Sequence, residues 1–413
     1  MNSLTQPIEA KFSPFALFTL YLIIFLGSAG FFITIPAYVS LFLTDHSLAI
    51  AQNMPIEQRR ELFGTVMSAA PFISMFFTPL LARLADHFGR KIMMAICLLI
   101  AGIGFILPVY AIALGSVVLL FAGNMINSLG SASQPMAQAV LSDNSEGKNK
   151  AALMSLVAVV MTAAMSFGPA LGSKLTAMYG AEGPFYACLF IALICLALLQ
   201  TVRLPKQHKA DSDNPLSFVA PLQRSQSGLI KSLAIVFLGQ FSWSLYFQNI
   251  SFIFPQKWQL EVSGSFYQNY MMAIGIVMII ALLALPKWIL SRWSVTKALR
   301  ITLLFAALGM AALALTPTPL THTIAMVVTA TFVAISFPLY ITSLSNRASD
   351  IDQGWAMAMS SAMVGLAWTL TGYLTAVLVN INLMLPTWIA VIGYIAASFL
   401  VPKMLNKEMV DAQ

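Results

Sequence analysis

Charged residues are scarce in this sequence: Asp, Glu, Lys and Arg make up only 9% of its 413 residues, whereas 59% are hydrophobic. Soluble domains carry roughly 25% charged residues, so a soluble globular protein of this length is excluded. The shortage is uneven, because all 15 acidic residues fall between long apolar runs or at the ends of those runs. The apolar runs themselves are therefore free of carboxylates.

Cysteine and histidine are equally scarce. The three cysteines and four histidines show neither a pairing pattern nor the spacing of metal ligands, so we expect no structural disulfide, no metal and no cofactor. The sequence lacks the phosphate-binding pattern G-x-x-x-x-G-K-[ST] of ATP-driven pumps. No His and Asp share an apolar run as a membrane-embedded catalytic pair would, and no ring of charges or carbonyl filter loop indicates a channel. These absences argue against a pump, an enzyme and a channel.

Long apolar runs are what the sequence has in abundance. They approach the length needed to cross a hydrocarbon core of about 30 Å. They lie near residues 15–43, 62–82, 92–114, 117–141, 151–173, 184–202, 231–254, 267–286, 299–316, 321–343, 355–379 and 385–402. The tail before the first run has little positive charge, and no cleavage site follows that run, which favours a retained first helix over a signal peptide. We predict an all-α membrane protein with twelve transmembrane helices.

Lys and Arg are distributed asymmetrically over the connections between these runs. Alternate connections, a set that includes both ends of the chain, hold 18 basic residues, and the other connections hold 4. The positive-inside rule places the basic set in the cytoplasm, so both termini are predicted to be cytoplasmic. The dispersal of the bases over short segments also argues against a nucleic-acid-binding module, despite a net charge of +7.

The longest hydrophilic stretch runs from about residue 203 to residue 231. It contains Pro205, Pro215 and Pro221 and charges of both signs, which is typical of a linker. Equal numbers of apolar runs precede and follow it. We therefore predict an N-terminal six-helix bundle at residues 1–203, a cytoplasmic linker at 204–230 and a C-terminal six-helix bundle at 231–413, the arrangement of transporters built from two related halves.

The turn after the second run carries the most specific motif. It gathers an acid, a glycine and two bases, which are Asp86, Gly89, Arg90 and Lys91. A turn this tight needs glycine where φ is positive. The stretch resembles the loop signature of the major facilitator superfamily, G-x-x-x-D-R/K-x-G-R-R/K, except that Ala82 and His87 replace a glycine and a base. The resemblance implies a cytoplasmic latch that stabilises one conformation, in which Asp143 is the partner of Arg90.

The fifth run resembles a second motif of that superfamily. Gly168, Pro169 and Gly172 match the antiporter pattern g-x-x-x-G-P-x-x-G-G, with Ala164 and Ser173 in place of two glycines. Glycine and proline at these positions allow a kink and provide a flat face on which another helix packs closely. The motif is associated with drug and proton antiporters, so the resemblance implies a twelve-span exporter, which we expect in the inner membrane of a bacterium.

Polar side chains within the runs are candidates for a solute-binding site, since lipid disfavours them. One helical face of the fourth run carries Asn124, Asn127, Ser128 and Ser131, and one face of the seventh carries Gln240, Trp243, Ser244, Phe247 and Gln248. Further candidates in other runs are Thr34, Tyr38, Tyr340 and Trp368. Each could instead serve an interhelical hydrogen bond worth about 1 kcal/mol. Amides, hydroxyls and aromatic rings without a fixed charge favour a neutral or amphiphilic organic solute.

The means of energy coupling is not evident in the sequence. Proton-driven members of the resembled superfamily usually hold a titratable carboxylate within a span, and this chain has none there. Proton carriers would then lie at helix ends, where the candidates are Asp45, Glu61, Lys174 and Glu182, or the solute itself would carry the proton. We predict a monomeric secondary transporter in the lipid bilayer that exports a drug, a siderophore-like compound or a metabolite in exchange for protons. An importer or uniporter of a nutrient or metabolite in the same fold is the alternative.

Overall fold

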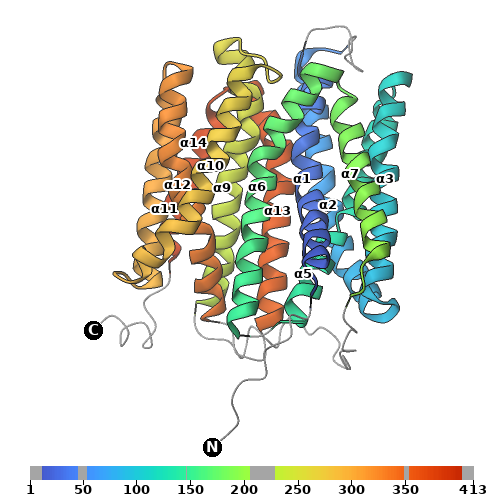
Figure 1. Cartoon of the computed structure of the whole chain (residues 1–413). Helices are drawn as coiled ribbons and strands as arrows, with labels where there is room; N and C mark the ends of the chain where they lie inside the picture. The colour runs from blue at the N-terminus through green and yellow to red at the C-terminus, as the bar shows by residue number, and fades with distance from the viewer. Residues whose placement is uncertain (1–11, 45–53, 146, 205–227, 348–352, 402–413) are drawn as a thin grey trace, which may run out of the picture.

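The computed structural model describes residues 12–44, 54–145, 147–204, 228–347 and 353–401. The regular structure in this part of the chain is helical, and the helices stand side by side in one bundle (Figure 1). The helices are α1 (Pro14–Leu43), α2 (Ile56–Phe88), α3 (Arg90–Leu114), α4 (Val117–Gly130), α5 (Ser133–Asp143), α6 (Gly147–Tyr179), α7 (Gly183–Thr201), α9 (Leu229–Trp258), α10 (Ser265–Leu290), α11 (Val295–Leu315), α12 (Pro319–Ser345), α13 (Gln353–Ile381) and α14 (Leu385–Leu400). Among these residues, 10 helices are long and apolar enough to cross a membrane, and α14 is a shorter apolar helix. The predicted all-α membrane fold is confirmed.

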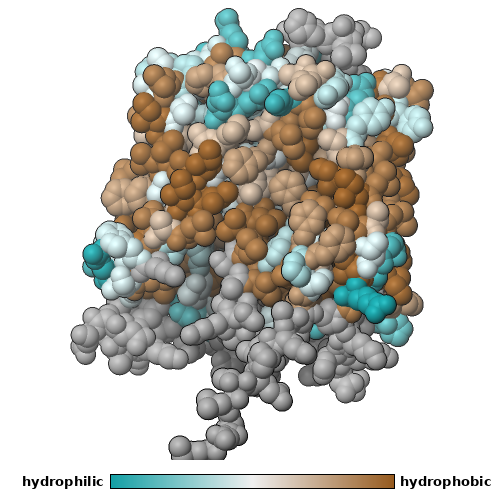
Figure 2. Space-filling model, viewed as in Figure 1, coloured by the Kyte–Doolittle hydropathy of each residue, from teal (hydrophilic) through white to brown (hydrophobic). Residues whose placement is uncertain are grey.

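Apolar side chains cover the outside of the bundle. Figure 2 shows hydrophobic side chains across the middle of the visible face and hydrophilic ones toward both ends. Large side chains such as Phe190, Ile324 and Phe399 are exposed. Monomeric soluble proteins rarely expose an apolar surface of this extent, so lipid tails cover it, and the chain is an integral multi-pass membrane protein.

The helix ends form two faces of the bundle (Figure 1). The terminal face holds Pro14 at the start of α1 and Leu400 at the end of α14, and the distal face holds Leu43 at the end of α1 and Ile56 at the start of α2. Because neighbouring helices in the chain run in opposite directions, the turn at Gly89 lies at the terminal face.

The fourth apolar run does not form one helix, contrary to the prediction from the sequence. It forms α4 and α5, with a turn at Ser131 between them. Pro135 explains the break, because a proline cannot donate a hydrogen bond to the carbonyl four residues earlier, and its ring crowds that carbonyl. The Ser131 hydroxyl donates instead to the Ser128 carbonyl at 2.6 Å, a local bond that competes with helix continuation.

Two helix pairs make the main contacts between the first set of helices, α1–α7, and the second set, α9–α14. These pairs are α2 with α13 and α6 with α10. A Cβ atom added to Gly372 of α13 would lie 2.4 Å from the Ser68 hydroxyl oxygen of α2, so glycine permits a close approach here. Nearer the distal face, the Arg60 guanidinium donates to the Asn380 side-chain oxygen at 3.0 Å. Contacts in the distal part of the bundle therefore hold the two sets together.

Candidate solute cavity

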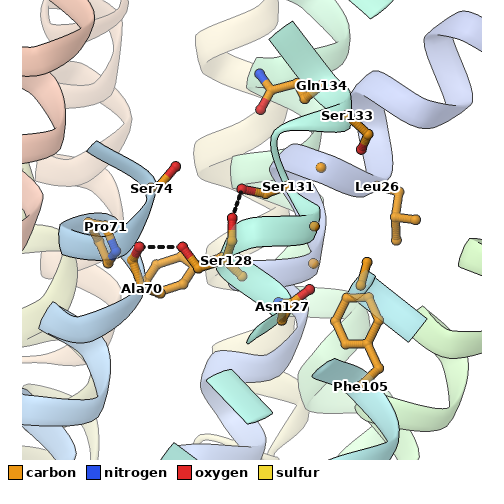
Figure 3. A pocket seen from close by; sticks show the side chains of 15 residues that line it. Leu26, Ala70, Pro71, Ser74, Phe105, Asn127, Ser128, Ser131, Ser133 and Gln134 are labelled. Atoms are coloured by element: carbon orange, nitrogen blue, oxygen red, sulfur yellow. Dashed lines mark hydrogen bonds between the residues drawn. The ribbon is translucent and has the colours of Figure 1, made fainter. Parts of the chain in front are cut away.

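A cavity of about 180 Å³ lies within the first set of helices. Helices α1, α2 and α3 line it with residues from near their middles, and α4 and α5 line it at the break between them, so it lies about halfway between the two faces. Its polar lining consists of Ser74, Asn127, Ser128, Ser131, Ser133 and Gln134. Figure 3 shows Asn127, Ser131 and Gln134 among the lining side chains, with Leu26 and Phe105. The described lining carries no charged side chain.

The polar stripe predicted on the fourth run divides between helix packing and the cavity. Asn124 is buried, and its side-chain amide donates to the Val66 carbonyl of α2 at 2.7 Å. One turn later the Ser128 hydroxyl donates to the Ala70 carbonyl (Figure 3). Asn124 and Ser128 thus hold α4 against α2, and Ser128 also lines the cavity together with the half-buried Asn127.

Most of the lining residues were not predicted from the sequence, among them Ser74, Phe105 and Gln134. Gln134 could have been identified, because it directly precedes Pro135 and a proline there interrupts the helix. Phe105 carries no polar signal, and only its packing on α1 places it, where a Cβ atom added to Gly30 would lie 2.9 Å from its ring.

An aromatic cluster joins the cavity to the second set of helices. Phe31, a lining residue, has its ring centroid 5.4 Å from that of Phe32 and 6.4 Å from that of Trp368 on α13. Phe32 lies 5.7 Å from both Trp368 and Phe247 of α9. These rings meet edge to face, a favoured aromatic geometry. Trp243 extends the cluster, with its ring centroid 5.7 Å from that of Phe247. Three of the predicted residues, Trp243, Phe247 and Trp368, therefore lie together where the two sets meet.

Gln240 connects three helices of the second set. Its side-chain amide donates to the Tyr340 hydroxyl of α12, and its oxygen accepts from the Trp368 indole nitrogen at 3.2 Å. Both polar atoms of this amide are therefore used inside the set. The network orients Trp368, whose ring belongs to the aromatic cluster.

Gln248 lies on α9 about two helical turns closer to the distal face than Gln240. Its amide donates to the hydroxyls of Ser244 and Thr371, both at 2.9 Å, and these hydroxyls lie 2.6 Å apart. Its side-chain oxygen is buried and has no hydrogen-bond partner in the described part of the chain. Gln248 and Phe247 also line a second cavity of about 10 Å³. Residues of α1, α2 and α6, from the first set, line its other side. An unpaired buried amide oxygen is uncommon, although the neighbouring Asn249 has one as well.

Thr34 and Tyr38 belong to the lining of neither cavity. The Thr34 hydroxyl donates at 3.0 Å to carbonyls of its own helix, those of Gly30 and Phe31. Tyr38 is 1% exposed and packs edge to face on Phe185 of α7, with ring centroids 5.5 Å apart. In this conformation both residues serve packing within the first set.

The glycines of the fifth-run motif lie where α6 crosses α1. A Cβ atom on Gly168 would lie 2.8 Å from the Phe32 Cβ, and one on Gly172 would lie 2.0 Å from the Ile33 carbonyl oxygen. Real Cβ atoms do not approach this closely, so the crossing requires glycine. Pro169 lines the second cavity. The motif thus packs α6 directly against the part of α1 that carries Phe32.

The turn between α2 and α3 contains the glycine geometry that the motif predicted. Gly89 has φ of +99°, a left-handed conformation that favours glycine. Beside it, the Lys91 ammonium donates to the carbonyls of Gln200 and Val202 at 3.1 and 2.7 Å. A cation at a helix C-terminus is favourable, so Lys91 stabilises the end of α7.

The remaining latch residues are described only in part. Arg90 is the first residue of α3 at the terminal face. Asp86 and Asp143 lie on α2 and α5, and their side chains are outside what the structure describes. The pairing of Arg90 with Asp143 stays a prediction.

The residues predicted to carry protons are spread along the distal part of the bundle. Glu61 and Lys174 are exposed, and the half-buried Glu182 occupies the N-cap position of α7. None of these three lines either cavity. Asp45 lies outside the described residues. The role of all four in coupling stays a prediction.

Comparison with known sequences places the chain among transporters. Residues 17–372 match the model of the Major Facilitator Superfamily. The tetracycline resistance protein of class H from Pasteurella multocida is 24% identical over 141 residues, which cover 34% of this chain and 32% of the relative. The class B protein from Escherichia coli is 20% identical over 211 residues, 51% of each chain. The chain thus spans about a third to a half of the length of these curated relatives.

Solved structures share the fold over nearly the whole chain. The inward-open xylose transporter XylE from E. coli has a TM-score of 0.72 at 18% identity and covers 97% of this chain and 99% of its own. The human organic anion transporter MFSD10 (TETRAN) has a TM-score of 0.68 at 17% identity and covers 96% and 100%. Identities this low establish the fold alone. With the family match across most of the chain, they confirm that this protein belongs to the major facilitator superfamily and is a membrane transporter, not an enzyme.

Proposed function

We propose that this protein is a secondary transporter that exports a small neutral or amphiphilic organic solute in exchange for protons. Its two halves, residues 1–203 and 231–413, would alternate in access about a midplane site and be joined by the linker at 204–230. The main support is the uncharged cavity, which lies midway between the faces and beside the aromatic cluster where the sets meet. A site at this depth suits alternating access, because either face can open to it.

The cavity volume sets how much of a solute it holds. Sites for drug-sized ligands occupy about 300–1,000 Å³, whereas this cavity has about 180 Å³. In the present conformation it therefore accommodates only part of a drug-sized solute. The remainder would extend past Phe31 into the contact between the sets, where Trp368 offers a ring and Gln248 an unpaired amide oxygen.

The relatives support export over import. Several of them are tetracycline resistance proteins, and a membrane transporter confers resistance most simply by moving the compound out of the cell. The fold alone does not set the direction, since a D-xylose–proton symporter and a nucleoside transporter share it. Import or uniport is therefore the second candidate.

Basic side chains support a cytoplasmic terminal face. Those of the described residues there include Arg90, Lys91, Arg203, Lys231, Lys297 and Arg300, as the positive-inside rule requires. In the inner membrane of a bacterium the distal face would then be periplasmic. The contacts between α2 and α13 would close the periplasmic side in this conformation, in a protein that acts as a monomer.

Transport into everted membrane vesicles tests this function. Tetracycline is the first probe, followed by a panel of neutral and amphiphilic antibiotics. We expect accumulation when the vesicle interior is acidified, and its loss when a protonophore removes the pH gradient. Ser131→Phe, which fills the cavity, should abolish accumulation and serves as the matched control. Equilibration without accumulation would establish uniport, and accumulation under the opposite gradient would establish import.

A further inference from the structure

A buried histidine lies at the centre of a hydrogen-bonded cluster in the second set of helices. His322, in the first turn of α12, has no exposed surface. Its Nδ1 atom lies 2.7 Å from the Thr316 hydroxyl, and its Nε2 atom lies 2.7 Å from the Tyr246 hydroxyl of α9. The Tyr246 hydroxyl is in turn 2.6 Å from the Tyr270 hydroxyl of α10. Tyr270 also stacks on the imidazole, with ring centroids 5.8 Å apart.

The groups that surround this cluster include one cation and no described carboxylate. From α9, the Lys257 ammonium donates to the Thr316 carbonyl at 2.7 Å, and the Trp258 ring lies 4.9 Å from the imidazole. From α10, Tyr267 lies next to Tyr270. The titratable groups that face the imidazole are therefore Lys257 and the tyrosines of α9 and α10.

The cluster can hold a proton without losing a hydrogen bond. A neutral imidazole donates from one nitrogen and accepts at the other, whereas an imidazolium donates from both. When His322 is protonated, the Tyr246 hydroxyl can accept from it and donate to Tyr270, so that the direction of the hydrogen bonds reverses. Burial and the nearby Lys257 ammonium both oppose the charged ring in the closed conformation. Water must therefore reach the His322 imidazole before a proton can bind there.

The position of the cluster links it to the contact between the sets. Tyr267 lines the second cavity, together with Pro169 of α6 and Phe63 of α2. Helix α10 packs on α6 across this contact. If the sets part at the distal face, α6 leaves α10 and water can reach the tyrosine side of the cluster.

We propose that His322 is the proton-binding site of this transporter, loaded from the distal face when the sets part there and unloaded when they close. A proton adds to the lone pair of the accepting ring nitrogen, and on closure it leaves along the hydroxyls of Tyr246 and Tyr270 toward the space between the sets. The inference rests on the proposed exchange of solute for protons. It replaces the coupling residues expected at helix ends, Glu61 and Glu182 among them, with a buried site.

Tryptophan fluorescence tests proton binding without any solute. An imidazolium quenches a neighbouring indole, so the purified protein in nanodiscs should show a pH-dependent quenching step that reports on Trp258. His322→Gln, whose amide can still bond to Thr316 and Tyr246, and Trp258→Phe should both lose the step. His87→Gln, which removes an exposed histidine at the terminal face, should retain it. A His322→Gln protein with the wild-type step would overturn the proposal.

A second variant and a transport assay complete the test. Tyr270→Phe keeps the ring stack but removes the hydroxyl that allows the reversal, so it should displace the quenching step even if His322→Gln does not fold. In everted vesicles with tetracycline as the probe, His322→Gln should lose accumulation driven by the pH gradient and retain exchange of labelled for unlabelled probe. Glu61→Gln and Glu182→Gln should accumulate the probe normally. Wild-type accumulation by His322→Gln would overturn the coupling role, whereas transport that fails for every protein tested would count against the proposed function and leave the fluorescence result to decide on proton binding.

Discussion

At the scale of single residues, hydrogen bonding separates the polar side chains that hold helices together from those that face the cavity. Asn124 and Asn127 lie three positions apart on α4, and periodicity places them on one helical face. In the structure Asn124 reaches the Val66 carbonyl, and Asn127 lines the cavity. One helical face is wide enough to contact a neighbouring helix and a cavity at once. The sequence could therefore predict the polar stripe, but not which of its residues contact a helix and which line the cavity.

This division predicts opposite effects for two substitutions one turn apart. Asn127→Ala should weaken solute binding by about 1–2 kcal/mol, the value of a lost polar contact, and leave thermal stability unchanged. Asn124→Ala should lower the free energy of unfolding by about 1 kcal/mol and leave affinity nearly unchanged. Binding titrations and thermal unfolding in detergent measure the two effects. The reverse pattern would show that Asn124, and not Asn127, contacts the solute.

At the scale of elements, the sequence indicated close packing at Gly168 and Gly172 but not the helix that packs there. The partner is α1, which precedes α6 by more than 100 residues, and such pairings depend on the whole fold. The break between α4 and α5 could have been predicted from Pro135, since the ring excludes a continuous helix. The break was overlooked because the run carries no charged residue on either side of it.

The α1–α6 crossing yields a prediction with a matched control. Gly172→Ala places a Cβ atom 2.0 Å from the Ile33 carbonyl oxygen, which forces α6 away from α1 and should cost about 1–3 kcal/mol of stability and slow transport. Gly102→Ala on α3 meets only the Leu189 Cδ1 atom at 3.5 Å, so it should be neutral or gain up to about 1 kcal/mol from helix propensity. Thermal unfolding and vesicle transport compare the two. Equal behaviour of both variants would refute the close crossing.

At the scale of the whole molecule, the sequence predicted the architecture well because a membrane allows few solutions. Lipid requires the backbone to hydrogen-bond within each span, so long apolar runs translate directly into helices. The cluster around His322 escaped the sequence analysis, since one polar residue near the start of a run has no pattern. Its partners Thr316, Tyr246 and Tyr270 come from other segments and meet only in the folded protein.

Orientation in the membrane is a property of the whole molecule, and two single cysteines test it. All three native cysteines are buried and are first replaced to give a cysteine-free background. Ser291→Cys lies in the turn between α10 and α11 at the terminal face, and Leu320→Cys lies at the distal face, 65% exposed in the wild-type side chain. An impermeant maleimide added to intact cells should label Leu320→Cys but not Ser291→Cys, with the opposite result in everted vesicles, because the positive-inside rule favours the cytoplasm for the basic terminal face. Labelling of Ser291→Cys in intact cells would contradict this orientation and make the closed distal face cytoplasmic, so that His322 would exchange its proton with the cytoplasm when the sets part there, although an exchange of solute for protons would still drive export, because the proton gradient sets the direction.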